Sequence, residues 1–211
     1  MSGRVVHQGC ALTWLRENRL PDDAGVLTSL PNFDEFAHRD VPRWRAWFAD
    51  AAELTLTRTP AAGACVFFQT DVKHDGVWID KSFLVQLAAE RAGVPLVWHK
   101  MALRAPPGTV TNHRPGFAHL LCFSRTVRSA QDNATPDVIE RVGAKSWARS
   151  MGAEVARAAV SWLAAHAGAR TVVAPFCGVG TALDAADALG LASIGVERNP
   201  GRARRAARAH S

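Results

Sequence analysis

The stretch VVAPFCGVGTALDAADALGLASIGVE, residues 172–197, decides the fold of this 211-residue chain. An apolar run ends in a turn that holds Gly178 and Gly180, Thr181 then opens an amphipathic stretch, and a second apolar run ends at Glu197. Glycines at such a turn let the backbone approach a ligand closely, and the helix that follows offers unpaired amides. A carboxylate after the next strand can accept both hydroxyls of a ribose. The stretch therefore predicts a nucleotide site built on a strand, a turn, a helix and a second strand.

Two other interpretations of this turn remain open. A dinucleotide-binding turn carries a third glycine where this chain has Leu183, so the full fingerprint is missing. A plain tight turn between a strand and a helix is the other alternative. The Pro175-Phe176 pair before the turn and the carboxylate of Glu197 after it favour a ligand site.

The rest of the chain alternates short apolar runs with amphipathic stretches, a pattern typical of a layered α/β domain. Asp80 is expected to cap one helix and Gly93 to end it. We expect strands at 26–29, 64–69, 95–100, 118–124, 171–173 and 192–196, and helices at 41–57, 82–92, 147–167, 181–189 and 202–210. The pattern predicts one domain over residues 1–211, with helices on both faces of the sheet.

Composition narrows the class of protein further. Lys and Arg outnumber Asp and Glu by 25 to 19, and a basic surface favours polyanions such as nucleic acids. No apolar run approaches the roughly 18 to 20 residues of a membrane span, and the N-terminus lacks the apolar core of a secretory signal. Four cysteines at positions 10, 65, 122 and 177 fit neither a zinc site nor a disulfide framework. We expect a cytoplasmic protein without a metal.

The turn at residues 174–181 resembles the "DPF-x-GSGT" loop of the amino-methyltransferases that modify adenine or cytosine in DNA, and of their RNA-acting relatives. Ala174 stands where that family usually has aspartate, and Val179 where it has serine. The resemblance implies a Rossmann-like fold and S-adenosylmethionine as the cofactor. The residues that it assigns to cofactor binding here are Pro175, Phe176, Gly178, Gly180, Thr181 and Glu197.

The rest of the chain resembles the circularly permuted branch of the same family, in which the catalytic strand precedes the cofactor loop. Residues 5–15 are similar to "I-x-GDAL-x-x-L", and residues 20–31 to "LPDNSVDLVVTSPP". Residues 96–100 and 117–124 resemble its "WHK" and "HE-x-I-L-x-FSK" strands. The likeness spans about residues 5–200 and implies a catalytic half at about 1–125 before a cofactor half at about 143–211.

Two further segments receive cofactor roles from this resemblance. Cys10 replaces the acidic residue of the "GDA" segment and is expected at the cofactor. Lys145 and Trp147 belong to the segment that the family places near the methionine end of the cofactor.

The family's catalytic tetrapeptide is Asp, Asn or Ser, then Pro-Pro, then an aromatic residue, and here it reads Ser29-Leu30-Pro31-Asn32. An exocyclic base amine is a poor nucleophile, because its lone pair is delocalised into the ring. A side-chain oxygen and a backbone carbonyl that accept its two hydrogens shift that lone pair toward a methyl donor. The hydroxyl of Ser29 and the carbonyl of Leu30 are the acceptors that this chain offers.

Asn32 replaces the aromatic residue that stacks on a flipped base, although Phe33 follows it. The departures leave three outcomes: amine methylation with altered geometry, methylation of another atom, or loss of catalysis. A strand-ending turn without catalytic role is the alternative for residues 29–33.

Polar side chains beyond the strand ends are candidates for substrate contact. They are Asp71, Lys73, His74, His99, Lys100 and Arg114. A solvated polar loop explains residues 71–75 equally well. His119, inside an apolar run, is expected to be a core histidine with its hydrogen bonds satisfied, and the C-terminal arginines are expected to form a solvated helix face.

The interval 125–142 is at most helix-sized, so we expect no separate target-recognition domain. A minimal catalytic domain fits a substrate recognised by its shape, which slightly favours RNA over DNA, or a chain that forms a homodimer or needs a partner subunit. Two other functions stay open. One is a non-catalytic protein of this fold that binds RNA or stabilises a partner, and the other is a small-molecule methyltransferase.

Overall fold

The computed structural model describes residues 3–36, 40–112, 114–147 and 150–208. The strands are β1 (Arg4–Gln8), β2 (Ala24–Thr28), β3 (Cys65–Gln69), β4 (Val72–His74), β5 (Val77–Ile79), β6 (Leu96–Leu103), β7 (Phe117–Phe123), β8 (Val138–Ile139), β9 (Thr171–Pro175) and β10 (Ala192–Glu197). The helices are α1 (Ala11–Glu17), α2 (Val41–Arg58), α3 (Lys81–Ala92), α4 (Ala153–His166), α5 (Thr181–Ala188) and α6 (Pro200–Ala206), with short 3₁₀-helices η1 (Phe33–Glu35) and η2 (Gln131–Asn133).

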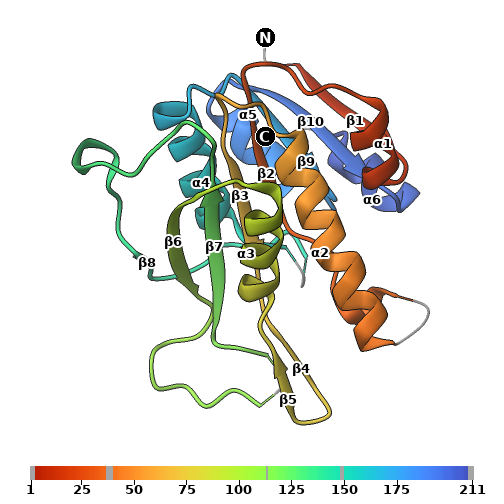
Figure 1. Cartoon of the computed structure of the whole chain (residues 1–211), viewed down its shortest axis with the longest axis vertical. Helices are drawn as coiled ribbons and strands as arrows, with labels where there is room; N and C mark the ends of the chain where they lie inside the picture. Colours follow the sequence, from red (N-terminus) through yellow and green to blue (C-terminus); the bar gives the residue numbers. More distant parts are fainter. Residues whose placement is uncertain (1–2, 37–39, 113, 148–149, 209–211) are drawn as a thin grey trace.

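A mixed sheet of eight strands forms the centre of the molecule, in the order β1-β10-β9-β2-β3-β7-β6-β8 (Figure 1). The strands from β1 to β3 run parallel, and β7 is antiparallel to both of its neighbours. The parallel strands β2, β3 and β9 are buried along their whole length, which explains their continuous apolar sequences.

Helices cover both faces of this sheet, as the sequence predicted. Along β3, Val66 and Phe68 face the core under α4 and α5, whereas Cys65 and Phe67 face the core under α2 and α3. This alternation follows from the two-residue period of a strand, and it divides the apolar interior into two cores, one on each face. The predicted α/β fold is confirmed.

The sheet contains a topological switch point between β9 and β2. The chain leaves β9 through α5 toward β10 on one side, whereas β2 leads toward β3 on the other. The hydroxyl of Thr28, at the end of β2, donates a hydrogen bond to the carbonyl oxygen of Pro175, at the end of β9. Ligands of open α/β sheets bind at such a point, beyond the carboxyl ends of the strands.

Two helix boundaries correct the sequence-based expectation. The helix expected at 147–167 is observed as α4 from Ala153, because Gly152 has a φ of 94°, and residues 148 and 149 lie outside the described part of the chain. A Cβ atom there would lie 2.2 Å from the carbonyl oxygen of Val142, so this position requires glycine. The last helix begins at Pro200 instead of 202, capped by Asn199, and residues 209 and 210 of the expected helix lie outside the described part of the chain.

Several short elements were not expected from the sequence: the strands β1, β4, β5 and β8, the helix α1 and the 3₁₀-helices η1 and η2. For residues 71–75 the sequence left both substrate contact and a solvated polar loop open. Residues 72–74 instead form the first strand of the β4–β5 hairpin, which turns at Asp75 and Gly76 with φ values of 49° and 76°. The hairpin and the loop after β6 project from the same end of the sheet (Figure 1). No helix within the described ranges is both long and apolar enough to cross a membrane.

Candidate functional site

A cavity of about 1090 Å³ opens at the carboxyl ends of β2, β3, β9 and β10. It brings together most of the site residues predicted from the sequence, although these come from both ends of the chain. Those in its lining are Cys10, Ser29, Leu30, Pro31, Asn32, Phe33, Asp71, Lys73, His74, Arg114, Trp147, Phe176, Gly178, Thr181 and Glu197.

Five predicted residues do not line the cavity: Pro175, Gly180, Lys145, His99 and Lys100. Pro175 contributes only its carbonyl oxygen, which accepts the bond from Thr28. Gly180, with a φ of 99°, allows α6 to approach, since a Cβ atom there would lie 3.1 Å from the Cα atom of Ala206. The structure therefore gives both residues a structural position behind the turn.

The carboxylate of Glu197 is held at the end of β10 by two backbone amides. Its Oε2 atom accepts from the amide of Gly178 at 3.0 Å, and its Oε1 atom from the amide of Asn199 at 2.7 Å. Each oxygen keeps a further lone pair for a ligand hydroxyl. This arrangement ties the turn to the end of β10 and leaves the carboxylate able to accept further hydrogen bonds.

Arg202 spans the cavity beside this carboxylate, a position that the sequence-based expectation of a solvated helix missed. Its guanidinium lies 4.7 Å from the ring centre of Trp147, 3.5 Å from Glu35 and 4.0 Å from Glu197. The side chain thus connects η1, the segment before α4 and the end of β10. A basic residue within the first turn of a helix gave no sequence signal for this contact.

Ser29 and Leu30 follow β2 and also line the cavity, and the tetrapeptide then turns into η1. The backbone amide of Asn32 donates to the Oε1 atom of Glu35 at 3.2 Å, so Asn32 caps η1. The Asn32 side chain accepts a hydrogen bond from Lys81. The residue that replaces the family's aromatic therefore has a capping role.

Phe33 does not supply the missing stacking surface. Its side chain is only 5% exposed. The centre of its ring lies 6.1 Å from that of Trp44 and 4.7 Å from that of His74. Three other aromatic side chains line the cavity instead: Phe36, Trp47 and Phe176. The ring centre of Trp47 lies 4.6 Å from that of Phe36 and 6.1 Å from that of Phe176. Sequence reasoning identified only Phe176 of these three.

Lys81 is the most unusual side chain in the lining, and it was overlooked because it opens the expected helix α3. This lysine is buried, and its Nζ atom donates to the Oδ1 atom of Asn32 at 2.8 Å and to the carbonyl oxygen of Leu30 at 3.4 Å. Burial lowers the pKa of this amine to about 7, although Asp71, Glu35 and Asp34 act in the opposite direction.

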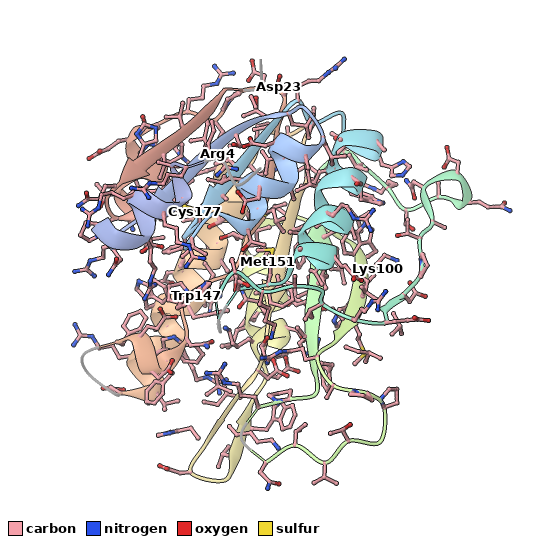
Figure 2. All side chains as sticks on the ribbon, turned by 180° about the vertical axis from the view of Figure 1, so that it is seen from behind. Arg4, Asp23, Lys100, Trp147, Met151 and Cys177 are labelled. Carbon is pink, nitrogen blue, oxygen red and sulfur yellow. The ribbon has the colours of Figure 1, made fainter. Side chains whose placement is uncertain are left out.

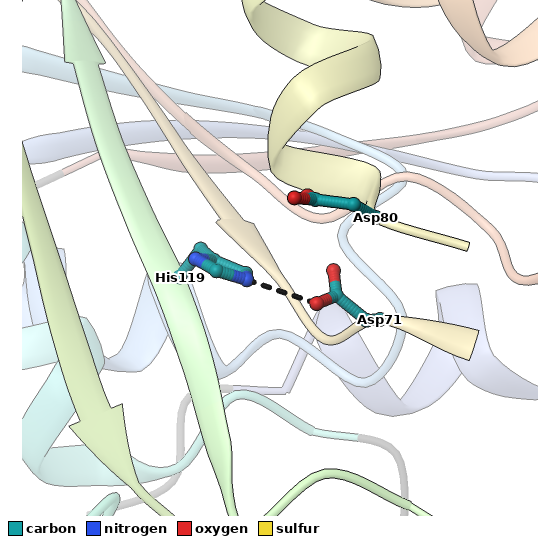
Figure 3. Close-up of side chains that lie close together, drawn as sticks. All are labelled: Asp71, Asp80 and His119. Carbon is teal, nitrogen blue, oxygen red and sulfur yellow. Dashed lines mark hydrogen bonds and ion pairs between the residues drawn. The ribbon is translucent and has the colours of Figure 1, made fainter. Parts of the chain in front are cut away.

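Asp71 connects the cavity to His119 and His99 through a chain of hydrogen bonds. Its Oδ2 atom lies 3.0 Å from Nε2 of His119, as Figure 3 shows, and Nδ1 of His119 lies 2.9 Å from Nε2 of His99. Asp71 also accepts from Trp78 Nε1 and from the backbone amide of Lys81. The prediction that His119 is a histidine with satisfied hydrogen bonds is confirmed.

Asp80 lies beside this network, and ligand atoms of Asp71, Asp80 and His119 fall within 4.8 Å of one another (Figure 3). The oxygens of Asp71 accept three protein hydrogen bonds, and Asp80 caps α3 through the amide of Phe83. These hydrogen bonds explain why the three side chains gather. Burial opposes ionisation of Asp71, but its donors outweigh burial and lower its pKa.

Lys100 contradicts the expectation that it ends its strand beside the substrate. Strand β6 continues to Leu103, and Lys100 is buried against the opposite edge, where it donates to Thr135 at 2.6 Å and pairs with Asp137 at 3.1 Å. Figure 2 shows it to one side of the molecule, away from Trp147, Met151 and Cys177. His99 is exposed and bonded to His119, so neither side chain reaches the cavity.

Three cations gather at the mouth of the cavity near the projecting hairpin. Arg104 and Arg114 line it, and Lys145 lies beside them. The pKa of Arg104 is lowered mainly by burial and, to a smaller extent, by the neighbouring charge of Arg114. The pKa of Lys145 is likewise lowered mainly by burial, with smaller effects from Arg104 and Arg114. Within the described part of the chain, no carboxylate pairs with any of the three. The arrangement concentrates positive charge for an anion.

The cavity fits S-adenosylmethionine by its chemistry. Its volume is at the upper end of small-molecule sites, which leaves room for a cofactor and part of a second molecule. The Oγ atom of Ser150 is buried at its wall without a hydrogen-bond partner among the described residues. Ala174, which stands where the resembled loop has aspartate, also lines the cavity and brings no charge there.

Compared by sequence, the chain matches no protein-family model and none of the curated proteins. Its structure is similar to that of a Thermus thermophilus protein described as a DNA modification methylase, with a TM-score of 0.73 and 17% identity over 96% of this chain and 92% of that one. The same protein complexed with S-adenosyl-L-methionine gives a TM-score of 0.72 at 17% identity, over 96% and 91% of the two chains.

The cytosine-N4-specific PvuII DNA methyltransferase gives a TM-score of 0.76 at 14% identity, over 98% of this chain and 86% of that one. The M1.HpyAVI–SAM complex gives 0.62 at 16% identity, over 96% and 98% of the two chains. These likenesses establish the fold alone: the chain shares the α/β fold of these methyltransferases.

Proposed function

We propose that this protein is an S-adenosylmethionine-dependent methyltransferase that modifies an amino group of a nucleic-acid base. One observation carries the proposal: the amide-anchored carboxylate of Glu197 and the strand end at Ser29 and Leu30 line the same cavity. The first is a nucleotide-binding arrangement, and the second offers two oxygen acceptors for an amine. We infer that the whole chain acts as one permuted methyltransferase domain.

In this proposal the residues around Glu197 bind the cofactor, and those around Ser29 bind the target base. Glu197 and the turn at Gly178 would hold the ribose, while Phe176, Trp147 and Cys10 would surround the rest of the cofactor. S-adenosylmethionine supplies an activated methyl group on sulfur. Ser29 and the Leu30 carbonyl would each accept a hydrogen from the target amine and so direct its lone pair toward that methyl group. Phe36 and Trp47 would stack on the base in place of the missing tetrapeptide aromatic.

The charge around the mouth of the cavity supports a nucleic acid as the substrate. Arg104, Arg114 and Lys145 would neutralise backbone phosphates beside the extruded base. The projecting hairpin adds Lys73, whose Nζ atom lies 4.9 Å from the centre of the Trp78 ring and donates to Thr111 in the neighbouring loop. A small-molecule substrate would not need this surface.

We infer DNA as the first substrate to test. The sequence-based preference for RNA depended on the short interval 125–142, taken as the loss of a recognition lobe. The protein described as a DNA modification methylase is nevertheless matched over 92% of its own length, so a short chain of this fold is no argument against DNA. RNA remains an outcome of the same experiment.

Labelled methyl transfer to methylase-free genomic DNA, ribosomal RNA and tRNA, measured in parallel, tests the proposal. We expect label in DNA, with Ser29→Ala slowing transfer about 10- to 100-fold while cofactor affinity stays unchanged. Ser129→Ala, at an exposed position outside the cavity, is the matched control. Calorimetry that detects no S-adenosylmethionine binding would overturn the enzyme assignment. Binding without transfer to any nucleic acid would favour a non-catalytic role.

A further inference from the structure

We propose that Lys81 accepts the proton that the target amine releases during methyl transfer, a role that rests on the proposed function. The Nζ atom lies 3.4 Å from the carbonyl oxygen of Leu30, which is also the expected acceptor for the target amine. The lysine and the target nitrogen would therefore converge on one oxygen from two directions. A carbonyl oxygen has two lone pairs and can serve both donors.

The hydrogen bonds of Lys81 match a neutral amine. A neutral amine has two hydrogens and one lone pair, and two acceptors are present, Asn32 Oδ1 at 2.8 Å and the Leu30 carbonyl oxygen. With both hydrogens engaged there, the lone pair is the group that remains for a substrate. Apolar packing of the stem would explain why the side chain is buried, but it does not explain why the amine is placed at the tetrapeptide.

The surroundings of Lys81 keep the two protonation states close in free energy. Burial disfavours the ammonium form and brings the pKa to about 7. Asp71 after β3 and Asp34 and Glu35 in η1 favour the charged form, and the Phe48 ring of α2 lies 5.2 Å from Nζ. An amine that can be neutral before the reaction and charged after it is suited to take up one proton.

The proton transfer is balanced without any further reagent. Once the target nitrogen carries the methyl group, it holds one hydrogen too many and a positive charge. That N–H bond breaks, its electron pair returns to the nitrogen, and the Nζ lone pair forms a new N–H bond. The product amine is then neutral and Lys81 is an ammonium, which later releases its proton to water.

Titration of the lysine side chains tests the protonation state without any cofactor. The chain contains only four lysines, at positions 73, 81, 100 and 145, so [¹³Cε]lysine labelling gives few resonances. We expect one resonance that titrates near neutral pH, that is lost in Lys81→Met and that persists in Lys145→Met. A Lys81 resonance that titrates at the ordinary lysine value would overturn the proposal.

Single-turnover methylation of unmethylated DNA tests the catalytic role. We expect the wild-type rate to rise with pH through about 7 and then level off, as Lys81 becomes neutral. Lys81→Gln can still donate to Asn32 but cannot accept the proton, so we expect a rate at least about 100-fold lower, without this pH dependence. Cofactor affinity should stay unchanged. Lys81→Arg should be equally slow, because a guanidinium keeps its proton.

The outcomes separate the two proposals. Normal wild-type transfer with an unaltered rate and pH profile in Lys81→Gln overturns the role of Lys81 alone. A wild-type chain that methylates no nucleic acid overturns the proposed function, and this role with it.

Discussion

The carboxylate of Glu197 accepts a hydrogen bond from the backbone amide of Gly178 at 3.0 Å, which ties the end of β10 to the turn after β9. The two residues are 19 positions apart, and Asn199 donates to the other carboxylate oxygen at 2.7 Å. The carboxylate therefore positions the turn as well as providing the proposed ribose contact. Removing it should disturb cofactor binding in two ways.

We predict that Glu197→Ala weakens S-adenosylmethionine binding by about 100-fold or more, because a charge-assisted pair of hydrogen bonds and the turn anchor are lost together. Titration calorimetry measures the change. Glu154→Ala, which removes a partly exposed partner of Arg141, is the control and should bind as the wild type does. Unchanged affinity in Glu197→Ala would place the ribose elsewhere.

The strand, glycine turn, helix and carboxylate at the Glu197 side of the cavity were predictable because their determinants are local in the sequence. Strand, glycine turn, helix and carboxylate follow one another between residues 172 and 197, and each is recognised by its own residue type. The β4–β5 hairpin had a similar local signal in Asp75-Gly76, between Val72 and Val77, and sequence reasoning overlooked it.

The role of Lys81 could not be predicted in the same way. Its bond to Asn32 joins residues 49 positions apart, and the sequence around either residue contains no sign of the other. The start of α4 is similar, since Gly152 is fixed by the carbonyl oxygen of Val142, in a segment that has no periodic pattern. Both features arise from the packing of distant segments.

Neutralising the cation cluster should weaken nucleic-acid binding at the cavity mouth. We predict that Arg104→Gln combined with Arg114→Gln lowers DNA affinity and reduces the slope of log affinity against log salt by about 2, since each phosphate contact contributes about 0.9. Fluorescence anisotropy across a salt series measures both quantities. Arg128→Gln, at an exposed arginine outside the cavity, should leave the slope unchanged. Equal slopes for all the variants would remove these arginines from the interface.

Asp71→Asn should destabilise the fold in a pH-dependent way. Burial opposes its ionisation, but hydrogen bonds from His119, the Lys81 amide and Trp78 lower its folded pKa below the ordinary value of 3.8. The stabilisation is therefore present above the unfolded pKa and is lost as pH falls through the folded one. We expect a loss of about 1–3 kcal/mol at pH 7, measured by urea unfolding, that shrinks toward pH 3. A loss of equal size at both pH values would show that the charge of Asp71 is not involved.

Lys81→Met should show how much the burial of the Lys81 amine lowers the free energy of unfolding of the wild type. The folded pKa of about 7 lies below the unfolded value of 10.5, so the unfolded chain binds more protons between these two limits. The wild type therefore gains stability as pH rises from about 7 to 10.5, whereas Lys81→Met lacks this gain. We expect the variant to be more stable than the wild type at pH 7, by a free energy of unfolding on the order of a few kcal/mol at most, with the difference shrinking toward pH 10.

Thermal unfolding across this pH range measures the difference in stability, and Lys73→Met, at an exposed lysine, should follow the wild-type curve. Parallel curves for the wild type and Lys81→Met would mean that the buried amine keeps an ordinary pKa, and the proton-accepting role would lose its physical basis.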